Sequence, residues 1–227
     1  MSNELWLIWK EPKSRRRYKV GVLTKYENIY TFNYVNPELD LAKEAGFNYF
    51  PGFDNLTKKY ESEILFANIA TRLPNKKRED YLEILNCYDL NIDSNEFEIL
   101  KATRGRTITD NYEFVPAFDL NKIEFDVAGT SHCKDIEKCK DLLKVNKKLY
   151  LEPEKNNLKD DNAIKIIFKE NDVSYHLGYV PRYYSKQLLL ELEKGIQYSA
   201  LIQSINFNSK LSDENITAIV KLIFDTK

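Results

Sequence analysis

Three segments in the first third of the chain are rich in β-branched and aromatic side chains, and in places they alternate apolar with polar residues. They cover residues 5–9, 18–24 and 29–34. Alternation with a period of two is typical of strands that are buried on one face. Short polar stretches at residues 13–17 and 25–28 separate these segments and suit turns. The pattern therefore predicts a three-stranded antiparallel meander.

Beyond Pro37 the apolar residues are spaced as they are in helices. Four helices are predicted, over residues 38–45, 62–73, 78–90 and 95–103. Pro74 ends the second of them, and Gly105 follows the fourth. Their apolar stripes indicate a buried core rather than a binding surface. A strand is predicted at residues 112–115, and clustered Pro, Asp and Asn then predict a linker at residues 117–122.

Strands predominate in the remaining region, residues 123–227. They are predicted at residues 123–129, 148–152, 164–169, 174–180, 198–207 and 216–224. One helix is predicted at residues 184–194, ended by Gly195. Because strands outnumber helices here, we expect a closed or nearly closed barrel with few sheet edges. The fold class predicted for the whole chain is α+β, with one domain at residues 1–116 and a second at residues 123–227.

The composition is that of a globular protein, with 43% hydrophobic and 30% charged residues. No apolar run approaches the roughly 20 residues that span a bilayer, and the first residues lack the basic and apolar regions of a signal peptide. The three cysteines are an odd number, placed far apart, which suits a reducing compartment. We therefore expect a cytoplasmic protein without a membrane segment.

The net charge of −1 gives the chain no overall positive field that would attract nucleic acid. Any such binding would have to use local groups of Lys and Arg. These groups occur at residues 13–19, 58–59, 76–78 and 144–148. Taken one by one, they are more typical of solvated turns than of a binding patch.

No catalytic constellation is visible along the chain, whether a nucleophile with its base, a metal cage or a phosphate-binding loop. Asp89 begins a segment similar to a calcium-binding loop, but Ser94 replaces its Gly and Leu100 replaces its bidentate Glu. His132 and Cys133 lack the paired ligand spacing of a zinc site. The sequence therefore predicts no enzyme, no metal and no cofactor.

Residues 146–182 combine several motifs in one order. A Glu-Pro pair ends a strand at Pro153, an Asn-rich turn follows, and Asp160-Asp-Asn-Ala-Ile164 leads into the next strand. Gly178-Tyr-Val-Pro-Arg182 closes the region. This combination resembles the HIRAN domain. The resemblance implies a small β-barrel (OB/SH3-like) with one helix, which binds single-stranded DNA or DNA ends.

The same resemblance indicates which residues would bind nucleic acid, in the opening loop, the Asn-rich turn and the Gly-Tyr-Val-Pro-Arg segment. They are Ser131, His132, Asn157, Lys159, Asp160, Tyr179, Arg182 and Tyr183. Asp160 would accept a hydrogen bond from a terminal 3′ hydroxyl and repel a continuing phosphate. Tyr179 would stack on a base, and Arg182 would contact a phosphate. A structural alternative stays open, in which the turn residues only satisfy backbone groups and Tyr179 only fills the barrel wall.

A second set of motifs lies in the first domain. The meander is followed by Phe50-Pro-Gly-Phe53, by Arg72-Leu-Pro74 and by a segment that runs from Arg104 to Asp110. Together they resemble, less specifically, the N-terminal subdomain of HipA-type Ser/Thr kinases. The resemblance implies docking on a kinase core that is encoded separately. The chain has no Gly-rich phosphate loop and too few remaining residues for a catalytic lobe, so it is not expected to be a kinase itself.

The combined hypothesis is a non-catalytic protein with two binding partners. Its first domain would dock on and regulate a HipA-type kinase core, as the antitoxin of a toxin-antitoxin pair does, and its second would bind single-stranded DNA or 3′ DNA ends. One alternative is a stand-alone DNA-repair or phage-defence adaptor without a kinase partner. Another is a nuclease, which would require clustered carboxylates for metal ions.

Overall fold

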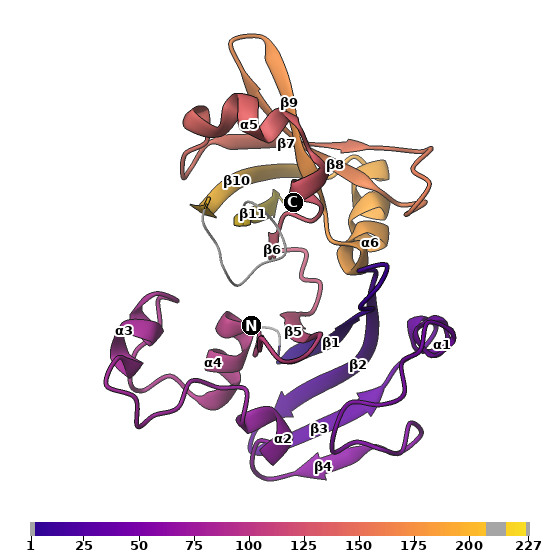
Figure 1. Cartoon of the computed structure of the whole chain (residues 1–227), viewed down its shortest axis with the longest axis vertical. Helices are drawn as coiled ribbons and strands as arrows, with labels where there is room; N and C mark the ends of the chain where they lie inside the picture. Colours follow the sequence, from indigo (N-terminus) through magenta and orange to yellow (C-terminus); the bar gives the residue numbers. More distant parts are fainter. Residues whose placement is uncertain (1–2, 208–216, 226–227) are drawn as a thin grey trace. The chain divides into compact units, whose positions relative to one another are not determined.

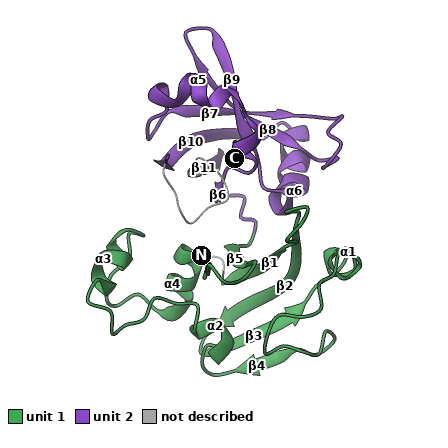
Figure 2. Ribbon diagram, viewed as in Figure 1, with its two compact units in different colours: residues 1–117 green, residues 118–227 purple. Residues whose placement is uncertain are grey.

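The computed structural model describes residues 3–207 and 217–225, and these residues form two compact units. Unit 1 comprises residues 1–117 and unit 2 comprises residues 118–227 (Figure 2). Each unit is built around its own antiparallel sheet (Figure 1). In the part of the chain that the structure describes, none of the helices combines the length and the apolar composition needed to cross a bilayer.

The sheet of unit 1 has five strands in the order β4-β3-β2-β1-β5. The predicted meander is confirmed, since β1, β2 and β3 pair antiparallel in sequence. A fourth strand, β4, which the sequence pattern did not predict, pairs with β3 at one edge, and β5 pairs with β1 at the other. Their bounds are β1 Glu4–Lys10, β2 Arg17–Tyr26, β3 Ile29–Tyr34, β4 Tyr60–Ser62 and β5 Tyr112–Pro116.

Four short helices complete unit 1, namely α1 Glu38–Glu44, α2 Ala67–Ala70, α3 Tyr81–Asn86 and α4 Glu96–Thr103. Helix α4 begins as predicted, because the Asn95 side chain accepts from Phe97 N and Glu98 N while Glu98 accepts from Asn95 N. The helices predicted at residues 62–73 and 78–90 are too long.

The late start of each helix has a local cause. Residues 60–62 pair with β3 instead of starting a helix. Before α3, Asn75 organises a turn by accepting from Lys77 N at 2.9 Å, so that the helix begins only at Tyr81.

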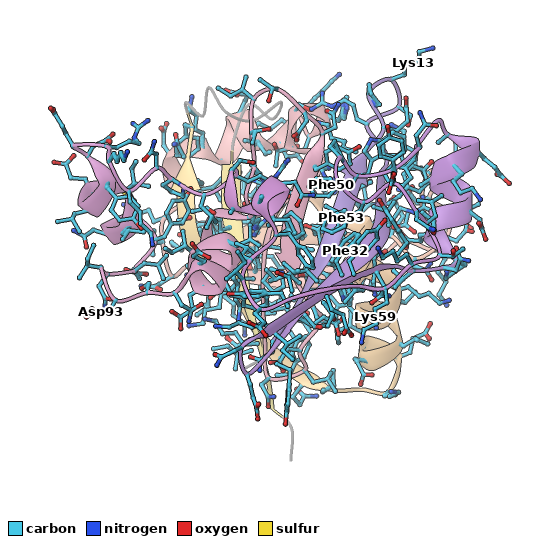
Figure 3. The ribbon with its side chains drawn as sticks, turned by 90° about the horizontal axis from the view of Figure 1, so that it is seen from below. Lys13, Phe32, Phe50, Phe53, Lys59 and Asp93 are labelled. Atoms are coloured by element: carbon cyan, nitrogen blue, oxygen red, sulfur yellow. The ribbon has the colours of Figure 1, made fainter. Side chains whose placement is uncertain are left out.

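Aromatic side chains fill the core of unit 1. Phe32 of β3 stacks on Phe53 with ring centroids 4.2 Å apart, and Phe50 packs on Phe53 at 5.9 Å. Figure 3 shows these three rings together in the middle of the view, with Lys13 and Asp93 at its edge. Helices contribute to the same core through Leu39 of α1, Ile69 of α2 and Leu100 of α4.

The sheet of unit 2 has six strands in the order β6-β11-β10-β7-β8-β9. Their bounds are β6 Lys122–Asp126, β7 Lys148–Pro153, β8 Ile164–Glu170, β9 Val173–Tyr179, β10 Gln197–Asn206 and β11 Thr217–Asp225. Helix α6 Arg182–Glu193 follows β9, and Tyr184 on it packs edge-on against Phe118 at 6.3 Å. Three elements were not predicted: the 3₁₀ turns η1 Thr130–His132 and η2 Lys140–Leu142, and helix α5 Asp135–Cys139.

The two outer strands of this sheet meet through one bridge. Ala128, just after β6, exchanges two backbone hydrogen bonds with Tyr179 of β9, at 2.9 and 2.8 Å. Gly178 makes this close approach possible, since a Cβ there would lie 2.5 Å from the Ala128 carbonyl oxygen. The prediction of a barrel-like unit with antiparallel strands is thus confirmed, whereas its OB/SH3-like type stays a prediction.

Candidate nucleic-acid interface

The loop between β7 and β8 is organised by one side chain, Asn157. Its amide oxygen accepts from Lys159 N at 2.9 Å and from Asp160 N at 3.1 Å, as in an Asx turn. Its amide nitrogen donates to the Glu154 carboxylate at 2.7 Å. The loop is therefore held in one conformation by its own polar groups.

Asp160 and Arg182 fasten this loop to the first turn of α6. The Asp160 carboxylate accepts from Asn162 N at 3.0 Å and from the Ser185 hydroxyl at 2.8 Å. Arg182 Nη1 donates to the Lys159 carbonyl oxygen at 2.6 Å. Two segments separated by more than twenty residues in sequence thereby form a single surface.

Glu154 lies at the centre of a second group of polar contacts, at the end of β7. Besides Asn157, it accepts from the Tyr179 hydroxyl at 3.0 Å and pairs with Lys165 Nζ at 2.5 Å. The hydrogen bonds from Asn157, Lys165 and Tyr179 lower the pKa of Glu154 to about 2, so that the carboxylate is ionised at neutral pH. The network links β7, β8, β9 and the loop.

Tyr179 faces this carboxylate and is half-buried. Burial, followed by the hydrogen bond to Glu154, raises the pKa of Tyr179 to about 12. Its ring meets His176 edge-on, with centroids 4.8 Å apart at an interplanar angle of 88°. The hydroxyl is therefore engaged as a donor, and the ring is fixed between β9 and the loop.

The structure thus brings together five of the residues that the sequence predicted for the site. Hydrogen bonds connect them into one patch, directly or through Glu154 and Ser185: Asn157, Lys159, Asp160, Tyr179 and Arg182. Asp160 also carries out the structural role that was left open, because both of its oxygens satisfy groups of this chain.

The other three predicted residues are placed differently. Ser131 and His132 belong to η1, which directly follows the bridge between Ala128 and Tyr179, and His132 is exposed. Tyr183 is buried, with 7% of its surface exposed, and packs edge-on against Tyr184 at 4.6 Å. Because its ring is not presented to solvent, Tyr183 offers no face on which a base could stack.

Sequence reasoning missed three members of the patch: Glu154, Lys165 and Ser185. Glu154 directly follows the Glu-Pro pair that was interpreted only as the end of a strand. Ser185 lies one helical turn after Arg182, and its hydroxyl donates to the Arg182 carbonyl oxygen as well as to Asp160. Helical spacing would have found it had the helix been predicted to begin at residue 182 rather than 184.

Positive and apolar groups stand at the rim of the patch. Lys159 and Lys155 are exposed, and Arg182 is half-buried. Leu158, between Asn157 and Lys159, is fully exposed at the loop tip. Among residues 3–207 and 217–225, no group of three or more His, Cys, Asp or Glu side chains is arranged to hold a metal ion.

Comparisons with known proteins agree with the sequence motifs in unit 2. Residues 120–217 match the family model of the HIRAN domain. Two similar solved structures are the crystal structure of the HIRAN domain of human HLTF and that of a protein from Lactobacillus plantarum. No curated protein matches the chain.

The likeness to both solved structures is distant. The human domain is 17% identical, with a TM-score of 0.36, and the match covers 46% of this chain and 75% of that one. The Lactobacillus plantarum protein is 20% identical, with a TM-score of 0.32, and the match covers 45% of this chain and 99% of that one. The family match, which leaves residues 1–119 outside, identifies a HIRAN domain at residues 120–217.

Proposed function

We propose that unit 2 binds single-stranded DNA, including 3′ ends, and does so without catalysing a reaction. The observation that carries this proposal is the HIRAN match over residues 120–217, since domains of this family are expected to bind DNA. The binding surface would be the loop 154–162 together with the first turn of α6. The hydrogen bonds that tie these two segments together support this assignment, because a preformed surface loses little entropy on binding.

This surface carries positively charged side chains and an aromatic ring, which suit a single strand of DNA. Proteins bind single strands through contacts with the phosphates and by stacking aromatic rings on the bases. Lys159 presents an exposed ammonium group. Arg182 uses Nη1 for the Lys159 carbonyl oxygen, and a guanidinium has five N–H donors, so others can reach a phosphate. The ring of Tyr179, held by Glu154 and His176, would meet a base.

Asp160 would give the site its preference for a terminal nucleotide. A carboxylate has about four lone-pair positions, and Asp160 uses two of them within the chain. A 3′ hydroxyl could donate to another, whereas a 3′ phosphate would be repelled by the same charge. In this way one side chain both fixes the loop and favours an uncapped end.

Fluorescence anisotropy of labelled single-stranded oligonucleotides tests both parts of the proposal. We expect the full chain to bind an oligonucleotide with a free 3′ hydroxyl more tightly than the same sequence with a 3′ phosphate. Equal affinity would contradict end recognition, and no binding of either would contradict the DNA-binding function. A parallel incubation with Mg²⁺ should leave the oligonucleotides intact, and cleavage would contradict the absence of catalysis.

For unit 1 we propose docking on a HipA-type kinase core, which the unit would regulate. The support is the residue pattern of Phe50-Pro-Gly-Phe53, Arg72-Leu-Pro74 and the segment from Arg104 to Asp110. Co-purification with a kinase core that lacks its own N-terminal subdomain is the expected result, together with a change in kinase activity. A kinase that neither binds nor responds would instead favour a stand-alone DNA-repair or phage-defence adaptor.

A further inference from the structure

The three cysteines of the chain are thiols in three different surroundings. Cys87 is exposed, Cys139 is buried and Cys133 is half-buried. Cys139 lies 3.6 Å from the Ile136 carbonyl oxygen, and burial raises its pKa to about 11. If exposure alone decided how fast a thiol reacts, Cys87 would react first, Cys133 second and Cys139 last.

Cys133 differs from the other two because a histidine stands beside it. The Cys133 sulfur lies 3.7 Å from His176 Nδ1. The other ring nitrogen, Nε2, lies 3.0 Å from the Gly178 carbonyl oxygen. A carbonyl oxygen can only accept, so Nε2 carries the proton, and in a neutral ring Nδ1 then presents its lone pair. The thiol therefore donates to Nδ1.

The backbone holds both partners in place. Strand β9 pairs with β8 through Ile167 opposite His176 and Ile166 opposite Gly178, which leaves Leu177 as the extra residue of a bulge. Bulges redirect side chains and are frequent beside functional sites. On the other side, Cys133 N donates to Thr130 O at 3.1 Å at the end of η1. The sulfur and the imidazole are thus positioned by two separate backbone features.

The groups around His176 favour a neutral ring that can accept a proton. Burial lowers its pKa, and the Lys165 ammonium acts in the same direction. The hydrogen bond to the Gly178 carbonyl oxygen and the carboxylates of Glu154 and Asp135 oppose this without reversing it, and Asp135 also accepts from His176 N at 3.2 Å. The Tyr179 ring covers the imidazole edge-on. At neutral pH the imidazole is therefore a base that faces a half-exposed thiol.

We propose that Cys133 is an activated thiol that is modified by low-molecular-weight disulfides, with His176 as its general base. As the Cys133 sulfur attacks one sulfur of the disulfide, its proton passes to His176 Nδ1 and the original S–S bond breaks. The leaving thiolate takes this proton back from Nδ1 and departs as a thiol. The products are a mixed disulfide on Cys133 and one thiol, so no further oxidant is required.

Glutathione disulfide is the probe, and the full wild-type chain provides the first test. After short exposures at pH 7, peptide mapping by mass spectrometry gives the rate of adduct formation at each cysteine. We expect Cys133 to react several-fold faster than the more exposed Cys87, because a histidine beside a thiol favours the reactive thiolate. Cys139 should react more slowly than both. If Cys87 reacts first, exposure governs the rates and the proposal is overturned.

A His176→Gln variant gives the second test, since Gln retains a donor for the Gly178 carbonyl oxygen but has no basic nitrogen. We expect its Cys133 to react no faster than Cys87, while Cys139, which is buried in the same unit as His176, stays slower than both and reports that the fold persists. An unaltered ratio of the two rates would overturn the role of His176. The wild-type ratio needs no variant, so the proposal remains testable if this variant does not fold.

Discussion

The two units use charged side chains in different ways, although both are built on antiparallel sheets. In unit 1, Arg72 is 6% exposed and makes a bidentate pair with Asp110 at 2.7 Å, and it donates to the carbonyl oxygens of Gly105 and Tyr112. In unit 2, the Glu154 carboxylate, at the end of β7, accepts hydrogen bonds from Asn157 and Tyr179 and forms an ion pair with Lys165.

This difference shows how burial separates a structural role from a binding role. The guanidinium of Arg72 also packs over Phe50 and Tyr112, so the pair with Asp110 belongs to the aromatic core of unit 1. The Glu154 network instead ends at half-exposed and exposed groups, among them Arg182 and Lys159, which can still meet a ligand. The first arrangement stabilises a fold, and the second leaves Lys159 and Arg182 at the surface.

The largest effect is expected for Arg72→Leu. The change leaves Asp110 without its partner and two carbonyl oxygens without a donor, so the free energy of unfolding should fall by about 4 kcal/mol. Urea unfolding of the full chain measures this. Arg78→Leu is the matched control, because Arg78 pairs with Asp80 at the surface and water screens that pair. Equal losses in both variants would contradict a structural role for Arg72.

A smaller effect is expected for Gly178→Ala, which tests the closure of the barrel. The new Cβ would lie 2.5 Å from the Ala128 carbonyl oxygen at a backbone φ of +143°, so the bridge to Tyr179 must shift. We expect a loss of about 2–3 kcal/mol in the free energy of unfolding. Gly46→Ala, at φ +99° with nothing within 4 Å, should lose only about 1 kcal/mol. A Gly178 variant as stable as the Gly46 variant would argue against the bridge.

The Glu154 network should show in the pH dependence of stability. Because the pKa of Glu154 is lowered in the folded chain, its contribution is complete above the ordinary value of 4.5 and is lost as the pH falls toward about 2. The difference in stability between wild type and Glu154→Gln should therefore shrink over that range.

NMR titration of the Glu154 carboxyl provides the direct measurement. Its midpoint should lie near pH 2 in the wild type, and Asn157→Ala should raise it most, since Asn157 is the main cause of the shift. Tyr179→Phe should raise it by less. A wild-type midpoint near 4.5 would contradict the network.

The sequence was sufficient for most strands but not for the short helices. The strand signals in the sequence located β1 to β3 and all six strands of unit 2, because apolar, β-branched and aromatic residues recur in each of them. Helix α5 was missed because only Ile136 and Cys139 of its five residues are buried, too few to show a helical period. The helix predicted from residue 62 relied on Ile64, which is 75% exposed, so its apparent period did not reflect a buried face.

The sequence predicted only those parts of the candidate site whose contacts join residues close together in the chain. The turn from Asn157 to Asp160 follows from side chains that bond neighbouring backbone groups. The contacts of Asp160 with Ser185 and of Glu154 with Tyr179 join residues 25 positions apart, and they depend on how β7, β9 and α6 come together. Tyr183 was predicted to contact a ligand because the sequence placed the start of this helix at residue 184. A helix that begins at residue 182 turns the Tyr183 side chain into the core instead.

A matched pair of double substitutions tests the central claim most directly, through the salt dependence of single-stranded DNA binding. Lys159→Ala with Arg182→Ala should weaken binding by about ten-fold and reduce the log-log slope against salt by about 1.4, the value for two lost phosphate contacts. Lys186→Ala with Lys194→Ala removes the same charge from an exposed position within α6 and from its C-cap, and should leave the slope unchanged. Equal changes in both double variants would contradict a binding surface formed by the loop 154–162 and the first turn of α6.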